Sequence, residues 1–359
     1  MRITGSSPER GRGFSLVELM VGIAIGMLAV IIIMQMLLNY EGQKRTTMGG
    51  AEAQNAGSIA LHGMQREIGQ AGFGFSSGDV FGCGMTWSLP SGAAIATAVP
   101  LAPVTVNPAV AVIPAGDLNS DTLLVAFGNT LDQPQGNPIT QRAGGSYTVQ
   151  MPGSFSVGDR VFASAGGCAA NLVLESITQA PPTTTTTVSV ATGADGNILF
   201  NLGQAPQILA YAVRGGRLTM CDYLVNDCGL DANKGNAAIW VPVADNIVSL
   251  KAQYGRDTTA TPDGVVDAYD QTTPTTDRTD WMRIRALRLA LVARSAQYES
   301  RTNPATGAKE CDPVTTAQPV WDGSAASAIN LGGFADWQCY RYRVFQTVVP
   351  LRNVVWLGV

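Results

Sequence analysis

The sequence predicts an α+β fold in which one long N-terminal helix packs on a β-rich globular domain. Two observations predict it: an apolar run near the N-terminus that continues as a helical pattern, and a remainder of short strand-like runs separated by Gly, Pro, Asn and Asp. The composition agrees, because the 359 residues include 40 Gly and 19 Pro, and 46% of the residues are hydrophobic against 14% charged. Such a chain is too apolar to be disordered as a whole.

The first expected element is an apolar helix that is long enough to cross a membrane. Residues 14–38 carry a single charge, Glu18. At about 1.5 Å per residue, a helix of this length spans a hydrocarbon core of about 30 Å. A transmembrane helix is favoured over a cleaved secretory signal, whose apolar run ends after about 7 to 15 residues. Positive charges at Arg2, Arg10 and Arg12 favour a cytoplasmic N-terminus and a translocated body.

Residues 39–74 are expected to continue as an amphipathic helix that packs on the sheet of the globular domain. Small and apolar residues recur there at three- and four-residue intervals, at Met48, Ala51, Ala56, Ile59, Ala60, Met64, Ile68 and Ala71. His62, the only histidine of the chain, is expected on the surface of this helix. Because the chain has no other histidine, a Ser-His-Asp or Cys-His triad elsewhere is excluded, and so is a multi-histidine metal site.

Residues 75–359 are expected to form the β-rich domain. Strand-like runs cover 122–127, 147–151, 160–163, 172–177, 187–191, 208–213, 246–254, 286–294 and 340–349. Two segments between them, the Ala-, Pro- and Val-rich residues 89–115 and the Pro- and Thr-rich residues 181–187, predict extended loops or surface strands.

The six cysteines all follow the apolar run, on the side that the charge bias places outside the cytoplasm. An even number of cysteines in an oxidising compartment indicates disulfides, and six cysteines allow 15 pairings. Cys221 and Cys228 bracket a short loop, and Cys311 and Cys339 flank a loop-like stretch, which favours these two pairs. Elimination then leaves Cys83 with Cys168. Zinc is the less favoured alternative, because the sequence contains no C-x-x-C.

An acidic loop over residues 254–270 is the one candidate for a metal site. It contains Asp257, Asp263, Asp267 and Asp270, whose oxygens suit a hard cation such as calcium. Their spacing does not fit the D-x-D-x-D-G pattern, so a solvated acidic loop is the competing interpretation. No phosphate-binding loop, nucleophile elbow or metal-ligand set is present, and we expect neither a cofactor nor catalysis. A net charge of −4 without clustered Lys and Arg argues against nucleic-acid binding.

Residues 11–20, Gly-Arg-Gly-Phe-Ser-Leu-Val-Glu-Leu-Met, resemble the class III signal of type IV pilins and type II secretion pseudopilins. The resemblance implies a leader over residues 1–13, which a prepilin peptidase removes between Gly13 and Phe14 before the new Phe14 amine is methylated. That amine is cationic, and Glu18 of an adjacent subunit can neutralise it in an apolar helix bundle. Gly22 and Gly26 form a G-x-x-x-G step that lets another helix approach closely.

Residues 341–353 resemble the last strand of PilW-type minor pilins, a group related to the J-type pseudopilins. Shorter similarities to that group lie at residues 71–73, 82–83 and 254–257. The resemblance implies a minor pilin that assembles or primes a type IV pilus at or near its tip. It also implies a single-pass inner-membrane protein with a periplasmic body, which is later incorporated into the pilus at the cell surface. The implied partners are other minor pilins, the major pilin, prepilin peptidase, the inner-membrane assembly platform and membrane lipid.

Two alternatives remain open. A J-like minor pseudopilin of type II secretion shares the N-terminal pattern, although the large body favours the pilus. A membrane-anchored periplasmic enzyme or sugar-binding module is less favoured, because such a protein would have no need of Gly13 and Glu18.

Overall fold

The structure is a computed structural model that describes residues 15–130, 133–184, 186–275, 278–323 and 328–355. The side chains of residues 38, 39, 41–43, 45–49 and 355 are not among those described, so the expected position of Met48 is not tested. The chain divides into two compact units, Met1–Ala51 and Glu52–Val359. Helix α1 (Leu16–Gln70) begins in the first unit and ends in the second. The predicted α+β class is confirmed.

In the second unit, α1 buries one face against the globular body. Its buried residues are Ala53, Gly57, Ala60, Leu61, Met64 and Ile68, followed by Ala71 and Gly72 just after the helix. The predicted face is therefore correct from Ala60 onward but wrong at Ala51, which is exposed, and at Ile59, which is 71% exposed. The packed face continues toward the N-terminus through two small residues, Gly57 and Ala53, which lie about one and two turns before Leu61. Ile59 points away from that face. His62 is exposed, as expected.

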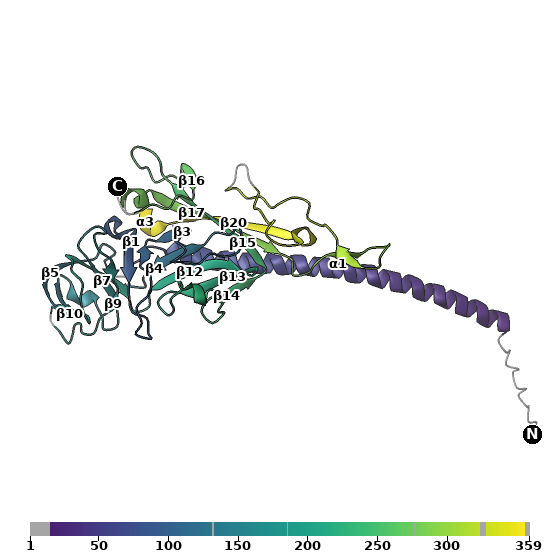
Figure 1. Ribbon diagram of the computed structural model, residues 1–359, viewed down its shortest axis with the longest axis horizontal. Helices are drawn as coiled ribbons and strands as arrows, with labels where there is room; N and C mark the ends of the chain where they lie inside the picture. Colours follow the sequence, from purple (N-terminus) through teal and green to yellow (C-terminus); the bar gives the residue numbers. More distant parts are fainter. Residues whose placement is uncertain (1–14, 131–132, 185, 276–277, 324–327, 356–359) are drawn as a thin grey trace, which may run out of the picture. The chain divides into compact units, whose positions relative to one another are not determined.

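Two antiparallel sheets meet this part of α1 (Figure 1). The five-stranded sheet has the order β14-β13-β12-β4-β3, and the four-stranded sheet has the order β16-β15-β17-β20. The strands of the first are β3 (Val104–Val106), β4 (Leu123–Phe127), β12 (Gln207–Arg214), β13 (Arg217–Asp222) and β14 (Val241–Asp245). Those of the second are β15 (Ile247–Arg256), β16 (Ala268–Asp270), β17 (Ile284–Arg294) and β20 (Tyr342–Pro350). β14 and β20 each end their sheet as an edge strand.

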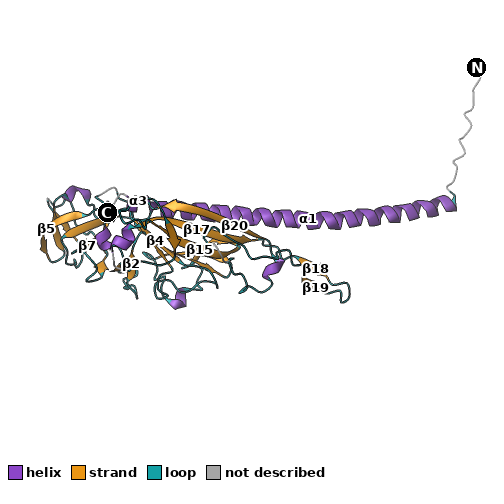
Figure 2. Cartoon of the chain, turned by 90° about the horizontal axis from the view of Figure 1, so that it is seen from above, coloured by secondary structure: helices purple, strands orange, loops and turns teal. Residues whose placement is uncertain are grey.

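The remaining strands form three further sheets. A three-stranded sheet contains β1 (Cys83–Thr86), β2 (Val99–Leu101) and β8 (Leu172–Val173). A six-stranded sheet contains β5 (Asn137–Ala143), β6 (Ser146–Val149), β7 (Arg160–Ser164), β9 (Glu175–Ser176), β10 (Thr187–Ser189) and β11 (Ile198–Gly203). A hairpin joins β18 (Ser300–Thr302) to β19 (Lys309–Cys311). Figure 2 shows β5 and β7 at the opposite end of the second unit from this hairpin.

Short helices complete the body. They are α2 (Arg278–Met282), α3 (Arg352–Val355) and the 3-10 helices η1 (Gly78–Val80), η2 (Pro152–Ser154), η3 (Asp231–Asn233) and η4 (Trp337–Cys339).

The main core lies between α1 and the five-stranded and four-stranded sheets. Strand β17 shows how the alternation of a strand builds it, because Leu287, Leu289 and Leu291 enter this core while Ala290 and Val292 face a smaller cluster on the other side of the sheet. The expectation of loops or surface strands over residues 89–115 is wrong at β2, where Val99 and Leu101 are buried, and at β3, where Val104 and Val106 are buried. Strand β3 pairs with β4 along one edge, and its valines pack in the main core.

Three disulfides close loops within the second unit. They join Cys83 to Cys168, Cys221 to Cys228 and Cys311 to Cys339, which are the pairs that the sequence favoured. All six cysteines are thereby used.

Candidate interaction surface

The first candidate surface is the apolar span of α1 from Leu16 to Leu37. It is 22 residues long with a mean hydropathy of 2.8, and none of it is buried. The carboxylate of Glu18 is its single charge, and the N–H of Ser15 donates a hydrogen bond to Glu18 Oε2 at 3.5 Å. Within the described ranges, no cation lies at salt-bridge distance from this carboxylate. The span therefore offers lipid or other helices an apolar surface with one unpaired acid.

Three of the residues that the sequence singled out share one side of this helix. Glu18, Gly22 and Gly26 follow one another at four-residue steps, which stacks them along one face. A Cβ built at Gly22 or at Gly26 meets no atom within 4 Å, so the surface at both glycines is open. The other two, Gly13 and Phe14, lie outside the described residues. A second helix can therefore approach closely just beside the carboxylate.

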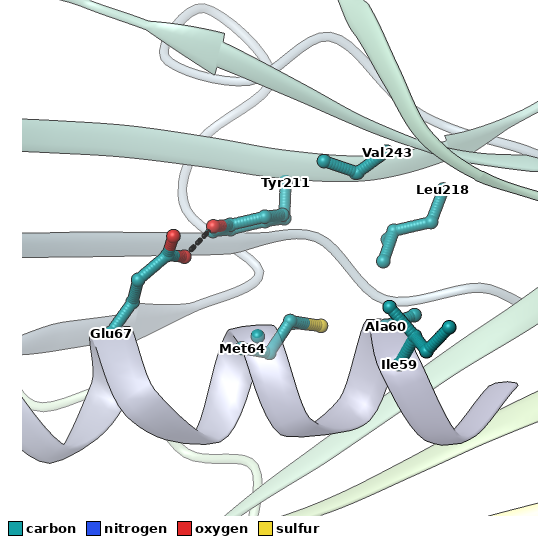
Figure 3. A pocket seen from close by; sticks show the side chains of 8 residues that line it. Ile59, Ala60, Met64, Glu67, Tyr211, Leu218 and Val243 are labelled. Atoms are coloured by element: carbon teal, nitrogen blue, oxygen red, sulfur yellow. Dashed lines mark hydrogen bonds between the residues drawn. The ribbon is translucent and has the colours of Figure 1, made fainter. Parts of the chain in front are cut away.

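A groove between α1 and β14, here called the β14 groove, is the second candidate surface (Figure 3). It has a volume of about 160 Å³ and is lined by Ile59, Ala60, Gly63, Met64, Glu67, Tyr211, Leu218 and Val243. Its walls are apolar, and Ile59 and Val243 are 71% and 47% exposed. The hydroxyl of Tyr211 donates a hydrogen bond to the carboxylate of Glu67 at one end. Burial of Tyr211, and secondarily the charge of Glu67, raises the pKa of the Tyr211 phenol, so it remains a donor.

A groove on the other side of α1, here called the β20 groove, is the third candidate surface. It has a volume of about 440 Å³, and its lining residues are His62, Gln65, Arg66, Gly69, Gln70, Val349, Pro350 and Arg352. The side-chain amide of Asn353 donates to the backbone oxygens of Gln70 and Ala71 at 3.1 Å each, which fastens the end of α1 to α3. These two hydrogen bonds therefore fix α3, which contributes Arg352 to the groove, relative to the end of α1. Apart from the surface position of His62, no sequence pattern indicates this groove.

The acidic loop contains one buried carboxylate, and the protein itself supplies its partners. Asp257 accepts hydrogen bonds from the hydroxyl of Thr259 at 2.6 Å and from the N–H of Gly264 at 2.7 Å, and Arg285 Nε lies 3.7 Å from its Oδ2. The hydrogen bond from the Thr259 hydroxyl is the largest cause that lowers the pKa of Asp257. Asp257 therefore holds the loop closed.

The other three aspartates are also occupied with local contacts. Asp263 accepts from the N–H of Val265 at 2.9 Å, Asp267 from the N–H of Thr258 at 2.8 Å, and Asp270 pairs with Arg256 Nε at 2.7 Å. No group of three or more His, Cys, Asp or Glu in the described part of the chain is arranged to hold a metal ion. Each of these carboxylates accepts hydrogen bonds from donors of its own loop, and the calcium interpretation of Asp257, Asp263 and Asp267 stays a prediction.

Comparison with known protein families finds two matching segments. Residues 217–353 match the family described as Type IV Pilus-assembly protein W, and residues 10–34 match the Prokaryotic N-terminal methylation motif. The first segment contains both edge strands, β14 and β20, and the second contains Gly13, Phe14 and Glu18. No curated protein and no solved structure matches the chain.

Proposed function

We propose that this chain, a type IV pilus minor pilin of the PilW type, acts in the assembly and priming of the pilus, at or near its tip. Helix packing and subunit contacts would be its mode of action. The observation that carries the proposal is the apolar span Leu16–Leu37, which is entirely exposed and holds one acid, Glu18. A surface of this kind is suited to a bundle of similar helices.

The pairing of charges explains why an acid is placed in such a helix. A carboxylate in the hydrocarbon costs on the order of a few kcal/mol unless it snorkels or finds a partner. Cleavage between Gly13 and Phe14 by prepilin peptidase would create that partner, the amine of Phe14 on a neighbouring subunit. Each charge then compensates the other and fixes the axial register of the two helices. Gly22 and Gly26, on the same face as Glu18, would allow the close approach.

The proposed organisation follows the chain in four parts. It consists of a leader over 1–13, a transmembrane helix over 14–38, an amphipathic helix over 39–74 and a β-rich periplasmic domain over 75–359. The exposed apolar helix and the methylation motif support membrane anchoring. The basic leader and three disulfides, which persist in oxidising compartments, support a cytoplasmic N-terminus and a periplasmic body.

The partners in this proposal are other minor pilins, the major pilin, the inner-membrane assembly platform and lipid. A J-like pseudopilin of type II secretion remains the second candidate, since it would use the same N-terminal features. The match of residues 217–353 to a pilus-assembly family favours the pilus. We expect no catalytic activity, because the methylation motif and Glu18 are features of assembly.

Deletion of the gene tests this proposal. We expect loss of surface pili with normal protein secretion, and recovery of pili when the wild-type chain is restored. Loss of secretion with a normal number of pili would overturn the assignment to the pilus and favour the pseudopilin.

A further inference from the structure

Among the described residues, strand β20 has no partner strand along its outer edge. The N–H of Leu351 donates to the oxygen of Arg285 at 2.9 Å, and the N–H of Ser295 donates to the oxygen of Arg341 at 2.8 Å, so the odd-numbered residues bond to β17. The backbone groups of Val344 and Val348 consequently point away from the sheet. No backbone hydrogen bond from the described residues reaches them. A free edge of this kind can accept an extended segment as an additional strand.

An added strand would direct its side chains to two different surroundings. The odd-numbered face of β20, with Phe345 and Val349, lies toward α1. The even-numbered face, with Val344, lies beside the cluster of Trp321, Ile329 and Leu331. Val348 on this even face is 46% exposed. Alternate residues of the added strand would therefore face α1, and the intervening residues would lie beside apolar side chains.

The side of α1 that borders this edge carries one cation, Arg66. His62, Gln65, Arg66 and Gly69 recur at helical spacing along it, and Arg352 of α3 closes the groove. No carboxylate lines the groove, and no salt bridge among the described residues uses Arg66 or Arg352. The exposed Arg341, by contrast, pairs with Glu299 at 3.0 Å. The two unpaired cations beside a free strand edge favour an acidic partner.

We propose that the β20 groove binds an extended acidic segment of another pilus subunit. Acidic residues at alternate positions face Arg66 and Arg352, and apolar residues at the intervening positions lie beside Val344 and Val348. The backbone of the segment pairs with the free edge of β20. A lipid headgroup or a nucleic acid offers anions but lacks the alternating N–H and C=O groups that this edge requires. The inference rests on the proposed function only for the identity of the partner as a pilus subunit.

A labelled peptide tests the proposal on the full chain purified in detergent. The probe is an eight-residue peptide of alternating glutamate and valine, and its binding is measured by fluorescence anisotropy. A peptide of the same composition with four glutamates followed by four valines is the control. We expect the alternating peptide to bind at least about tenfold more tightly than the block peptide, because only the first satisfies both faces.

Variants test whether binding needs the two arginines of the groove or any exposed arginine of the chain. The double variant Arg66→Gln/Arg352→Gln should weaken binding of the alternating peptide at least about tenfold, since both cations are lost. Arg301→Gln is the matched control, because Arg301 is an exposed arginine of the β18–β19 hairpin, and it should leave binding unchanged. Both arginines of the double variant are exposed, so its folding is checked by a melting curve that should match the wild type.

N-methylated peptides test strand addition itself. Methylating all the valines or all the glutamates blocks opposite edges of the peptide, so one of the two should lose binding and the other should keep it. Equal binding of these two peptides, equal binding of the alternating and block peptides, or displacement by an equal charge concentration of inorganic phosphate would overturn the proposal. Absence of binding would do the same. None of these results bears on Glu18 or on pilus number, which test the proposed function separately.

Discussion

The ring of Phe345 lies directly over the backbone of Gly57, and a Cβ built on Gly57 would stand 2.2 Å from Cε2 of that ring. Gly57 belongs to α1 and Phe345 to β20, so this contact joins the helix to the edge strand of the four-stranded sheet. A glycine in the middle of a helix is unfavourable by roughly 0.5–1 kcal/mol relative to alanine. Its presence here is explained by the space that the aromatic ring occupies.

Gly57→Ala should therefore destabilise the fold although alanine is the better helix former. We expect the overpacking to exceed the gain in helix propensity and the free energy of unfolding to fall by about 1–2 kcal/mol. Gly63→Ala is the control, because nothing lies within 4 Å of the Cβ there, and it should raise stability by about 0.5–1 kcal/mol. Urea denaturation measures both. A stabilised Gly57→Ala variant would contradict the contact, whereas Phe345→Leu should rescue that variant.

Tyr211→Phe tests the polar end of the β14 groove. The change leaves the Glu67 carboxylate without the hydroxyl that it accepts from, and we expect a loss of about 1–3 kcal/mol in unfolding free energy. Glu67→Gln keeps an acceptor for the hydroxyl and should cost less. Chemical denaturation of the two variants at pH 7 compares them. Equal stability of Tyr211→Phe and the wild type would show that water replaces the hydroxyl at no cost.

The acidic loop should make stability depend on pH through Asp257. Its pKa is lowered from the ordinary 3.8 in the folded chain, so its contribution is present above that value and is lost as the pH falls through the lowered folded pKa. Asp257→Asn should lower the Tm at pH 7 and flatten the decline of Tm below about pH 4. Asp263→Asn, a change at an exposed aspartate of the same loop, is the control. Thermal melts from pH 2 to pH 7 would contradict this account if both variants kept the wild-type slope.

The three disulfides should differ in their contribution to the free energy of unfolding. The Cys221–Cys228 pair is separated by 7 residues and the Cys83–Cys168 pair by 85. Chain entropy alone predicts that loss of the first costs about 2 kcal/mol and loss of the second about 4–5 kcal/mol. Paired Cys→Ser variants and denaturation in urea measure this order. The reverse order would mean that strain or residual structure dominates, and free thiols in denatured, unreduced protein would contradict the pairing itself.

The sequence predicted those features that depend on local pattern. The apolar span, the second half of α1 from Ala60 onward, and long strands such as β15 and β17 all follow from composition and period. The strand β11 was missed, because Leu199, Phe200, Asn201 and Leu202 are all buried and show no alternation. Burial of β3 depends on tertiary neighbours that no local pattern reveals.

The β20 groove could not be predicted for a related reason. Arg66 and Arg352 are far apart in the sequence, and each alone has the pattern of an exposed surface charge. Their common groove exists only because β20 ends beside the last turns of α1, where Asn353 bonds to the oxygens of Gln70 and Ala71. Likewise the Asp257 loop has the composition of a cation site, and only the positions of Thr259, Gly264 and Arg285 show that internal donors occupy its buried carboxylate.

The pairing of Glu18 with a neighbouring subunit is the central claim, and Glu18→Ala tests it most directly. The variant should insert and be cleaved normally, because it removes a costly charge and leaves Gly13 and Phe14 unchanged. Its co-purification with other pilins should fall at least about tenfold, because the neighbour's amine would be left unpaired in an apolar bundle. Val21→Ala, which shortens a side chain of the same helix without changing charge, should co-purify as the wild type does. A Glu18→Ala chain that is cleaved, co-purifies and supports pili at wild-type levels would contradict the account.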